Sequence, residues 1–484
     1  MKRLRWYDFI TINLFWLGLN IRNTAMGSIF MPYLVDVFVQ PEVKNTALGL
    51  LRTAGLIIAM LVQPAMGLLS DRSTSRFGRR RPFIVVGVVF DLVFLAAVGL
   101  SRSYGMLLIA TLLQQFSANV SHGALQGLIP DVVPEGQHGR AAAVKSIFEL
   151  LPIILVGFTI AKLVEAGQLG WAIVATGGGL LLTMLVTVWL VKEEPLRERP
   201  ATPLAAPMLR VLGILAGIVV GAAAGLASGA AVGGLAALIA WPFAGKFAAQ
   251  AIGVGVGGVV AMSVAVVVGV WAGALGTLGR DARRQKSFVW WVVNRLLFLA
   301  AVTSIQGFAP YFLMYAFGVN REAAAGMTGT LIGVVGIFMM ITALPSGWLA
   351  DRLGPRRLVG IGGLVAALGT LVLLGTIWVP SLPLIYVAGC IIGLAAGLFM
   401  TTNWSLGTTL VPAAEAGRYL GISNLAGAGA GMVGAGLGGP IADFLNRYRP
   451  GLGYFAIFAC YAVLFALSTV SLLGIKGAGR EATA

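Results

Sequence analysis

Four side chains that can exchange hydrogen bonds recur along one apolar stretch of the chain, residues 104–129. They are Gln115, Asn119, His122 and Gln126. Their spacings of four, three and four residues place all of them on one face of an α-helix. Amide and imidazole groups need a wet cavity or a neighbouring helix, because a lipid-facing position would leave them without partners. The stripe therefore predicts contacts with a polar ligand, and contacts between helices are the alternative.

Amides and amphipathic aromatic rings recur at three other places in apolar stretches. These further candidates for ligand contact are Asn20 and Asn23 in 9–35, Gln306 and Tyr311 in 288–317, and Asn403 and Trp404 in 382–410. An aromatic ring can stack on the CH face of a sugar while amides bond its hydroxyl groups. The composition favours a neutral polyhydroxyl ligand. For Trp404, packing or anchoring at the membrane interface is the alternative.

Five ionisable side chains also fall within apolar stretches: Arg22, Arg52, Asp91, Glu149 and Arg295. An unpaired charge at the middle of a bilayer costs at least about 2.5–3.5 kcal/mol, so each should meet an opposite charge or water. We expect Arg52 to pair with Asp91, and Arg22 to approach Glu149. A carboxylate that passes between dry and wet surroundings can bind and release a proton. Asp91 or Glu149 is therefore expected to carry a coupled proton, and purely structural ion pairs are the alternative.

The chain offers little for enzyme chemistry. It has two cysteines, both in apolar stretches, and two histidines. These counts exclude a disulfide framework, a cysteine metal site and HExxH zinc chemistry. The sequence also contains no GxxxxGK[ST] phosphate loop. We therefore expect no catalytic residue, no metal and no cofactor.

The elements that must position these side chains are membrane-spanning helices. Apolar residues make up 58% of the 484 residues and charged residues 11%, whereas soluble domains carry about 25% charged residues. A run of about 20 apolar residues is long enough for a helix to cross a bilayer. Fourteen such spans are predicted: 9–35, 46–69, 83–100, 104–129, 141–164, 170–190, 211–241, 247–278, 288–317, 325–350, 357–378, 382–410, 419–443 and 453–475. The predicted fold class is an all-α membrane protein.

The distribution of basic residues predicts the orientation. With the N-terminus inside, seven of the 34 Lys and Arg residues fall in external segments, three fall within spans, and the rest are cytoplasmic. This bias predicts that both termini are cytoplasmic, in a multi-pass protein of the plasma (inner) membrane. The net charge of +16 resides mainly in short loops between apolar spans, so we expect no nucleic-acid partner.

Two loop motifs occur twice. Gly67-x3-Asp71-Arg72 is repeated as Gly347-x3-Asp351-Arg352, 280 residues later, and Pro134-x4-Gly139-Arg140 is repeated as Pro412-x4-Gly417-Arg418, 278 residues later. Two motifs at nearly one offset indicate a duplication. The predicted domains are an N-terminal six-helix bundle at 1–195, a linker with a two-helix hairpin at 196–287, and a C-terminal six-helix bundle at 288–484.

These motifs resemble the major facilitator superfamily, and the longer form SDRSTSRFGRRRPFI is similar to the branch of sucrose/proton symporters and glycoside transporters. The resemblance implies two pseudo-symmetric bundles around a midplane site, and transport by alternating access. It also implies that loop residues form cytoplasmic gate contacts: Gly67, Asp71, Arg72, Gly78, Arg79, Arg80, Arg140, Gly347, Asp351, Arg352, Gly354, Arg356 and Arg418. Each loop aspartate should pair with an arginine or lie against a helix terminus. The alternative is that the arginines act only as topology signals.

The expected function is proton-coupled symport of a sugar or glycoside, which makes a small molecule, protons and membrane lipid the partners. Two alternatives remain open. The chain could carry or export a lipid-like or pigment-like amphiphile, or it could be a non-transporting assembly partner that retains a transporter fold.

The predicted central hairpin has a regular pattern of small residues. Glycine recurs every four residues at 213, 217, 221, 225, 229 and 233, and small residues continue this period from 253 to 273. Such seams let two helix backbones touch. The simplest prediction is that spans 211–241 and 247–278 pack on each other in a monomer. The alternative is a seam for lipid-side docking or a dimer.

Overall fold

The computed structural model describes residues 4–193, 195–196, 205–279, 281–411 and 416–475, and these ranges contain helices and loops but no strand. The elements of the first half are α1 (Trp6–Ala25), η1 (Met26–Phe30), α2 (Met31–Phe38), α3 (Lys44–Ser70), α4 (Arg81–Gly99), α5 (Tyr104–Gln126), α6 (Leu128–Val132), η2 (Glu135–Gln137), α7 (His138–Phe158), α8 (Ile160–Glu165) and α9 (Leu169–Leu190). The central elements are α10 (Ala205–Leu278) and α11 (Asp281–Arg284). The second half contains α12 (Lys286–Phe317), α13 (Arg321–Leu353), α14 (Pro355–Gly375), α15 (Leu382–Thr409), α16 (Ala416–Asn446), α17 (Leu452–Ser471) and η4 (Leu472–Gly474).

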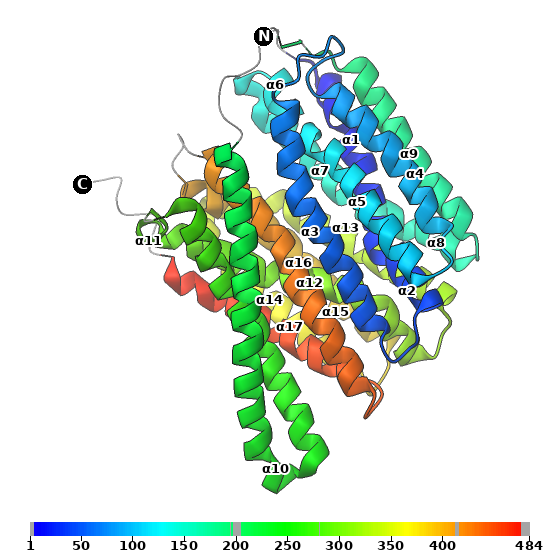
Figure 1. Cartoon of the computed structure of the whole chain (residues 1–484), viewed down its shortest axis with the longest axis vertical. Coiled ribbons are helices and arrows are strands. Elements are labelled where there is room, and N and C mark those ends of the chain that lie inside the picture. The colour runs from blue at the N-terminus through cyan, green and yellow to red at the C-terminus, as the bar shows by residue number, and fades with distance from the viewer. Residues whose placement is uncertain (1–3, 194, 197–204, 280, 412–415, 476–484) are drawn as a thin grey trace. The chain divides into compact units, whose positions relative to one another are not determined.

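Helices occupy all fourteen predicted positions (Figure 1). Ten helical segments of the described chain are long and apolar enough to cross a membrane, and one of them contains both arms of the central hairpin. α1 and α5 are not among the ten, because their polar residues lower the mean hydropathy. Their crossing of a membrane, and that of α16, stays a prediction.

The described chain forms two compact units. The first comprises Met1–Val39, Ala54–Met208 and Asn320–Gly336, and the second comprises Gln40–Thr53, Leu209–Val319 and Ile337–Ala484. In the first unit α1 packs against α7 and α9, and α4 packs against α5 and α9. In the second unit α12 packs against α16 and α17, and α14 packs against α15 and α17. The helix packing is thus repeated between the two halves of the chain, as the loop motifs predict.

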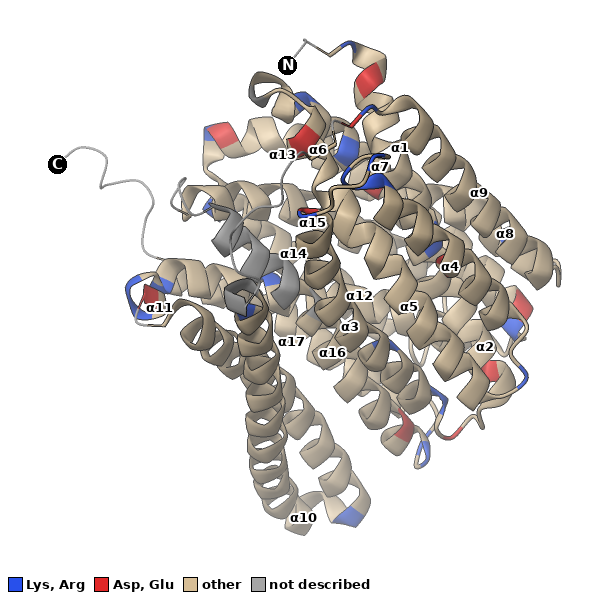
Figure 2. Cartoon of the chain, turned by 45° about the horizontal axis from the view of Figure 1, so that its top comes forward, with Lys and Arg blue, Asp and Glu red and all other residues tan. Residues whose placement is uncertain are grey.

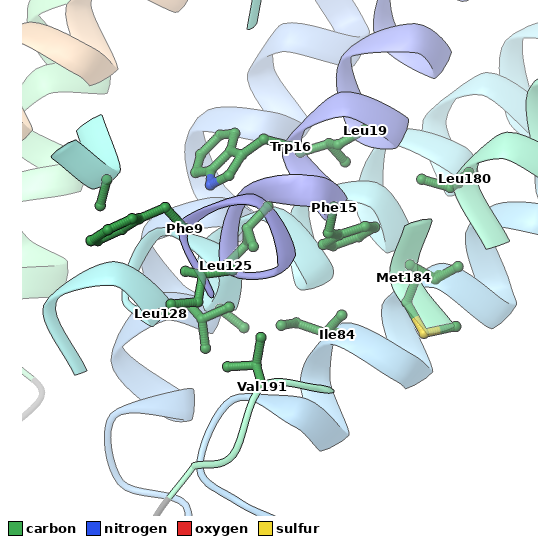
Figure 3. Packing of buried hydrophobic residues seen from close by; sticks show 14 of the residues in the cluster. Phe9, Phe15, Trp16, Leu19, Ile84, Leu125, Leu128, Leu180, Met184 and Val191 are labelled. Atoms are coloured by element: carbon green, nitrogen blue, oxygen red, sulfur yellow. The ribbon is translucent and has the colours of Figure 1, made fainter. Parts of the chain in front are cut away.

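The core of the first unit lies around α1. Phe15 and Leu19 of α1, Ile84 of α4 and Leu180 of α9 are almost completely buried in one cluster (Figure 3). α1 continues into a π-helical turn, η1, and then into α2, whose second residue is Pro32. A proline cannot donate the backbone hydrogen bond that a regular α-helix needs at that point, which explains the local widening.

The central hairpin is formed within α10. Gly245 has a left-handed φ of 75°, where the chain reverses between two arms that lie side by side (Figure 1). A Cβ on Gly221 or Gly225 of the first arm would collide with the backbone of Ala265 or Ala261 of the second arm. Only glycine permits such close approach, so the predicted seam between the two arms is confirmed. The second arm also packs on the second half of the chain, since Trp271 lies edge-on to Trp290 with ring centroids 6.5 Å apart.

Candidate functional site

A buried ion pair links α1 and α4 in the first unit. Arg22 Nη2 lies 2.9 Å from Asp91 Oδ2, and both side chains are almost fully excluded from solvent, at 2% and 0% exposure. The other carboxylate oxygen of Asp91 accepts a hydrogen bond of 2.8 Å from Gln114 Nε2 on α5. Arg22 also donates to the Asn23 side chain at 2.7 Å. Three helices therefore meet at one charged centre.

The two predicted charge pairs were wrong. Asp91 pairs with Arg22 rather than Arg52, and Glu149 lies 3.1 Å from Lys145 of its own helix α7, not beside Arg22. The guanidinium of Arg52 instead lies against Gly307 of α12, where any side chain would collide with it. The prediction for Arg52 and Asp91 relied on spans that follow each other in sequence, but the arginine that reaches Asp91 on α4 is Arg22 of α1, two spans earlier.

Sequence reasoning missed Gln114 as a member of the charged centre. Gln114 directly precedes Gln115, so it points about 100° away from the predicted stripe. A polar side chain off the polar face of an apolar helix must find a second buried partner. Gln114 is completely buried in the structure, as that rule predicts. Its position off the stripe was the signal available from the sequence.

A second polar cluster in the first unit surrounds Trp16 of α1. The His122 ring lies edge-on to the Trp16 ring at 5.3 Å, and the Lys145 ammonium lies 4.2 Å from the ring centroid. Lys145 and Glu149 are partly exposed, at 31% and 40%. The indole nitrogen of Trp16 is buried and has no hydrogen-bond partner among the described residues. This Trp16 cluster joins α1, α5 and α7.

The predicted stripe on α5 does not present a uniform face. Asn119 is 5% exposed and donates at 2.7 Å to the backbone oxygen of Gln115 in its own helix. Gln115 packs against Gly55 of α3, and Gln126 is exposed at the end of the helix. Of the four residues, only His122 contacts the Trp16 cluster.

The predicted ligand residues of α1 lie beside the same cluster. Asn20 is half-buried and donates at 2.9 Å to the backbone oxygen of Trp16. Asn23 is exposed and accepts the hydrogen bond from Arg22. The structure therefore places Asn20 next to the Trp16 cluster and Asn23 next to the buried ion pair.

In the second unit, Asn403 belongs to an interhelical network. Its side-chain amide donates at 2.7 Å to Asn294 Oδ1 on α12, and the Asn294 amide donates at 2.7 Å to the Ser468 backbone on α17. Asn403 and Asn294 are completely buried. The network satisfies both amide nitrogens and Asn294 Oδ1, whereas Asn403 Oδ1 is buried and has no hydrogen-bond partner among the described residues. These contacts between helices agree with the alternative interpretation of such polar residues.

The remaining candidates of the second unit lie in different surroundings. Trp404 is 39% exposed, and the guanidinium carbon of Arg295 lies 5.4 Å from its ring centroid. Gln306 is half-buried. Tyr311 is 1% exposed, and the Lys44 ammonium lies 4.7 Å from its ring centroid. Trp404 and Arg295 thus lie beside each other, whereas Tyr311 lies beside Lys44.

Replacing Asn403 by leucine is expected to lower the free energy of unfolding by about 1–3 kcal/mol, because Asn294 Oδ1 would lose its buried donor. Thermal unfolding of the purified protein in nanodiscs measures the effect. Gln126→Leu is the matched control, since it removes the same chemical group from an exposed position. Equal unfolding temperatures for Asn403→Leu and wild type would contradict a structural role for the network.

The loop after α3 is organised around Arg80, which is 4% exposed. Its guanidinium forms ion pairs with Asp71 and, at 2.8 Å, with Asp131. It also donates to Ser70 Oγ at 2.6 Å and to the Gly67 backbone at 3.3 Å. The predicted pairing of Asp71 with an arginine is confirmed. A Cβ on Gly67 would make only ordinary contact with Gly123, but a Cβ on Gly123 of α5 would collide with the backbone of Gln63 and Gly67.

Two carboxylates of this loop cluster were missed from the sequence. Asp131 also accepts from Arg79 at 3.1 Å, and Glu193 accepts from the Arg80 backbone at 2.8 Å. Gly78 has a left-handed φ of 110°, which lets the backbone turn toward Glu193. The signal was topological: Asp131 and Glu193 follow the fourth and sixth predicted spans, which the predicted alternation of spans ends on the same side as the second. Figure 2 shows charged residues gathered mainly at helix ends and in loops.

Among the residues that the structure describes, the equivalent loop of the second half shows no such charge cluster. Asp351 is exposed, and the guanidinium of Arg352 stacks on Trp348 at 3.9 Å. Gly354 has a left-handed φ of 82°. Arg356 donates at 2.9 Å to the backbone of Leu472. The two loops therefore differ in charge pairing.

One backbone contact is nevertheless common to both loops. Arg81 donates to the backbone oxygen of Val191 after α9, and Arg356 donates to the backbone oxygen of Leu472 after α17.

Of the other predicted gate residues, Gly347 has open space around it, Arg72 is half-buried, and Arg140 is exposed. Arg418 lies outside the residues whose side chains the structure describes.

Comparisons with known proteins agree with this fold. Sucrose transport protein SUT3 of Oryza sativa subsp. indica is 29% identical over 138 residues, which are 24% of this chain and 26% of that protein. Proton-associated sugar transporter A of Mus musculus is 39% identical over 79 residues, which are 16% of this chain and 10% of that protein. The chain therefore matches about a quarter or less of the length of these relatives.

Solved structures and a family profile extend the likeness over most of the chain. The crystal structure of a D-xylose-proton symporter superposes with a TM-score of 0.62 at 16% identity and covers 97% of both chains, a likeness of fold alone. Residues 17–435 match the profile of the Major Facilitator Superfamily. This multi-pass membrane protein therefore belongs to the Major Facilitator Superfamily.

Proposed function

We propose that the chain is a secondary transporter that couples the uptake of a sugar or glycoside to protons. The observation that carries the proposal is the buried Arg22–Asp91 pair with its bond to Gln114. Burying a charge pair in an apolar bundle is costly, and intramembrane ionisable groups typically mark ion or substrate pathways. Relatives named as sucrose transport proteins and proton-associated sugar transporters support this choice of substrate and ion.

Within this proposal Asp91, rather than Glu149, carries the proton. Protonation of Asp91 would remove the charge that holds Arg22 and would release a contact between α1 and α4. Glu149 is 40% exposed, and its partner Lys145 lies on the same helix. Protonation of Glu149 would therefore change little between helices, since exposed pairs contribute only about 0.2–1 kcal/mol.

The Trp16 cluster is the ligand-binding candidate of the same proposal. Lys145 and Glu149 supply a partly exposed donor and acceptor beside an indole and an imidazole. A sugar hydroxyl both donates and accepts, so it can bond such a pair, while the aromatic rings suit the apolar face of the sugar. Asn20 extends this surface by one helical turn.

Reconstituted liposomes test the proposal. A panel of sugars and glycosides is added under an imposed pH gradient, acidic outside, and charge movement is recorded. We expect an inward current with one sugar class that disappears when a protonophore removes the gradient. Protein-free liposomes are the control. No current across the panel from protein shown to be folded would overturn sugar symport, and would favour transport of an amphiphile or a role as an assembly partner.

A further inference from the structure

Two close backbone contacts join the first half of the chain to the second. In the second unit, a Cβ on Gly49 of α3 would collide with the backbone oxygen of Ala435 on α16. In the first unit, a Cβ on Gly157 of α7 would collide with the backbone oxygen of Gly329 on α13. Gly49 and Gly329 are 280 positions apart, and Gly157 and Ala435 are 278 apart. The two contacts are therefore equivalent under the internal repeat.

The first turn of α3 is capped by a residue from the other end of the chain. Asp443 of α16 accepts bonds from the backbone nitrogens of Asn45, at 3.3 Å, and Thr46, at 2.6 Å. It also accepts from the Asn45 side-chain amide at 2.7 Å. Asp443 is 4% exposed and lies 398 positions from Asn45. Caps usually come from the residue just before the helix, so this one couples folding of a helix end to a contact between halves.

The equivalent carboxylate of the first unit is held less firmly. Glu165 lies 278 positions before Asp443, and its carboxylate packs against Gly326 in the first turns of α13. Glu165 is 38% exposed and pairs with Lys162 at 2.6 Å. The first turn of α13 is tied instead to α2, where Tyr33 donates to Glu322 at 2.8 Å. Glu165, the repeat equivalent of Asp443, is therefore much less buried than the carboxylate that caps α3.

We propose that Asp443 is a conformational latch. In one of the two transport states it holds the first turn of α3, at the end of that helix away from the basic loops, against α16. A buried carboxylate with three donors at a helix N-terminus stabilises the contact by charge-assisted hydrogen bonds and by the helix dipole. Separation of α3 from α16 would leave both sides without these partners. The glycine contact at Gly49 lets the two backbones approach closely enough for the carboxylate to reach. The inference rests on the proposed alternation between two states.

Distances between spin labels at Val43→Cys and Arg447→Cys test the latch. Both positions are exposed, and each lies near one side of the contact. The native cysteines are first replaced, and the protein is measured in nanodiscs without substrate or a pH gradient. Asp443→Asn removes the charge and one acceptor. We expect it to lower the ratio of joined to separated molecules at least about fivefold, the size of a typical cap. Glu42→Gln, an exposed carboxylate just before α3, should leave the ratio unchanged.

Two further variants weaken the same contact independently, so that the test can still be made if Asp443→Asn misfolds. Asn45→Ala removes one donor to Asp443 and keeps the backbone intact, and Gly49→Leu drives a side chain into Ala435. Both should lengthen the distance in the same direction as Asp443→Asn. An unchanged distance distribution in folded variants would overturn the latch, whatever substrate or ion the transporter uses. A lengthened distance would support it even if no sugar current is found.

Discussion

Asp91→Asn is expected to abolish uphill uptake driven by a pH gradient, while exchange of substrate across the membrane continues. Asparagine mimics the protonated carboxyl group but cannot release a proton. The variant therefore cannot complete a cycle that requires the charged form. Exchange needs only the loaded form, so it should persist. Counterflow of labelled sugar and gradient-driven uptake, measured in the same liposomes, separate the two outcomes.

The matched control is Glu149→Gln, the same chemical change at the second candidate carboxylate. Because Glu149 is partly exposed and pairs within α7, its variant should keep uptake coupled to the pH gradient. Since Glu149 also supplies the acceptor of the Trp16 cluster, the expected loss is a higher KM for the sugar. Loss of coupling in Glu149→Gln but not in Asp91→Asn would show that the assignment of the proton to Asp91 is mistaken. Unchanged uphill uptake in both variants would exclude both carboxylates.

The same substitution should also be costly for stability. Removing one partner of a buried ion pair typically costs about 3–5 kcal/mol, because the other charge stays buried without compensation. We expect Asp91→Asn and Arg22→Gln to lower the unfolding temperature. The double variant Arg22→Leu with Asp91→Leu should recover much of the loss, since it buries no charge. Recovery of folding without recovery of coupling would separate the structural part of the pair from its role in transport.

The elements of the fold could be predicted because their signals are local. Runs of about 20 apolar residues mark helices whatever lies around them. Glycine at every fourth residue predicts a close seam between neighbouring spans, and the contacts between Gly221 and Ala265 confirm it. The repeated loop motif predicts equivalent halves, and in each half an arginine of the loop, Arg81 or Arg356, donates to a backbone oxygen just after the last long helix of that half.

Side-chain partners were harder to predict because they depend on how each helix is rotated and on which spans meet. Arg22 was expected to approach Glu149, yet the rotation of α1 directs it to Asp91. Asn403 was expected at a ligand, yet its helix turns it toward Asn294. Spacing identifies residues that share a helix face, but it does not say whether that face meets a ligand or another helix.

The latch residue Asp443 shows the same difficulty at long range. Its sequence neighbourhood contains no motif, and its partners Asn45 and Thr46 lie at the opposite end of the chain. The repeat offsets could have located it, because Gly49 and Gly329 mark equivalent positions that both need to be small. Such an inference requires knowing that the second span contacts the eleventh of the twelve repeated spans, which no local pattern provides.

Arg80→Gln is expected to lower the free energy of unfolding by about 2–3 kcal/mol, because the partly buried Asp131 carboxylate, Ser70 and the Gly67 backbone would lose a buried, charged donor. Arg79→Gln is the matched control. Arg79 also contacts Asp131, but the Arg79 side chain is 23% exposed. Its replacement should therefore lower the free energy of unfolding by only about 0.2–1 kcal/mol. Thermal unfolding in nanodiscs, at low and high salt, compares the two.

The salt dependence of unfolding shows whether Arg80 stabilises the fold through its buried contacts or acts only as a topology signal. A buried pair is screened little by salt, whereas exposed pairs weaken markedly. The deficit of Arg80→Gln should therefore remain at high salt, and that of Arg79→Gln should shrink. Arg356→Gln, in the equivalent loop of the second half, should resemble Arg79→Gln, because it removes a bond to the Leu472 backbone. Equal deficits for Arg80, Arg79 and Arg356 would mean that these arginines act only through their positive charge.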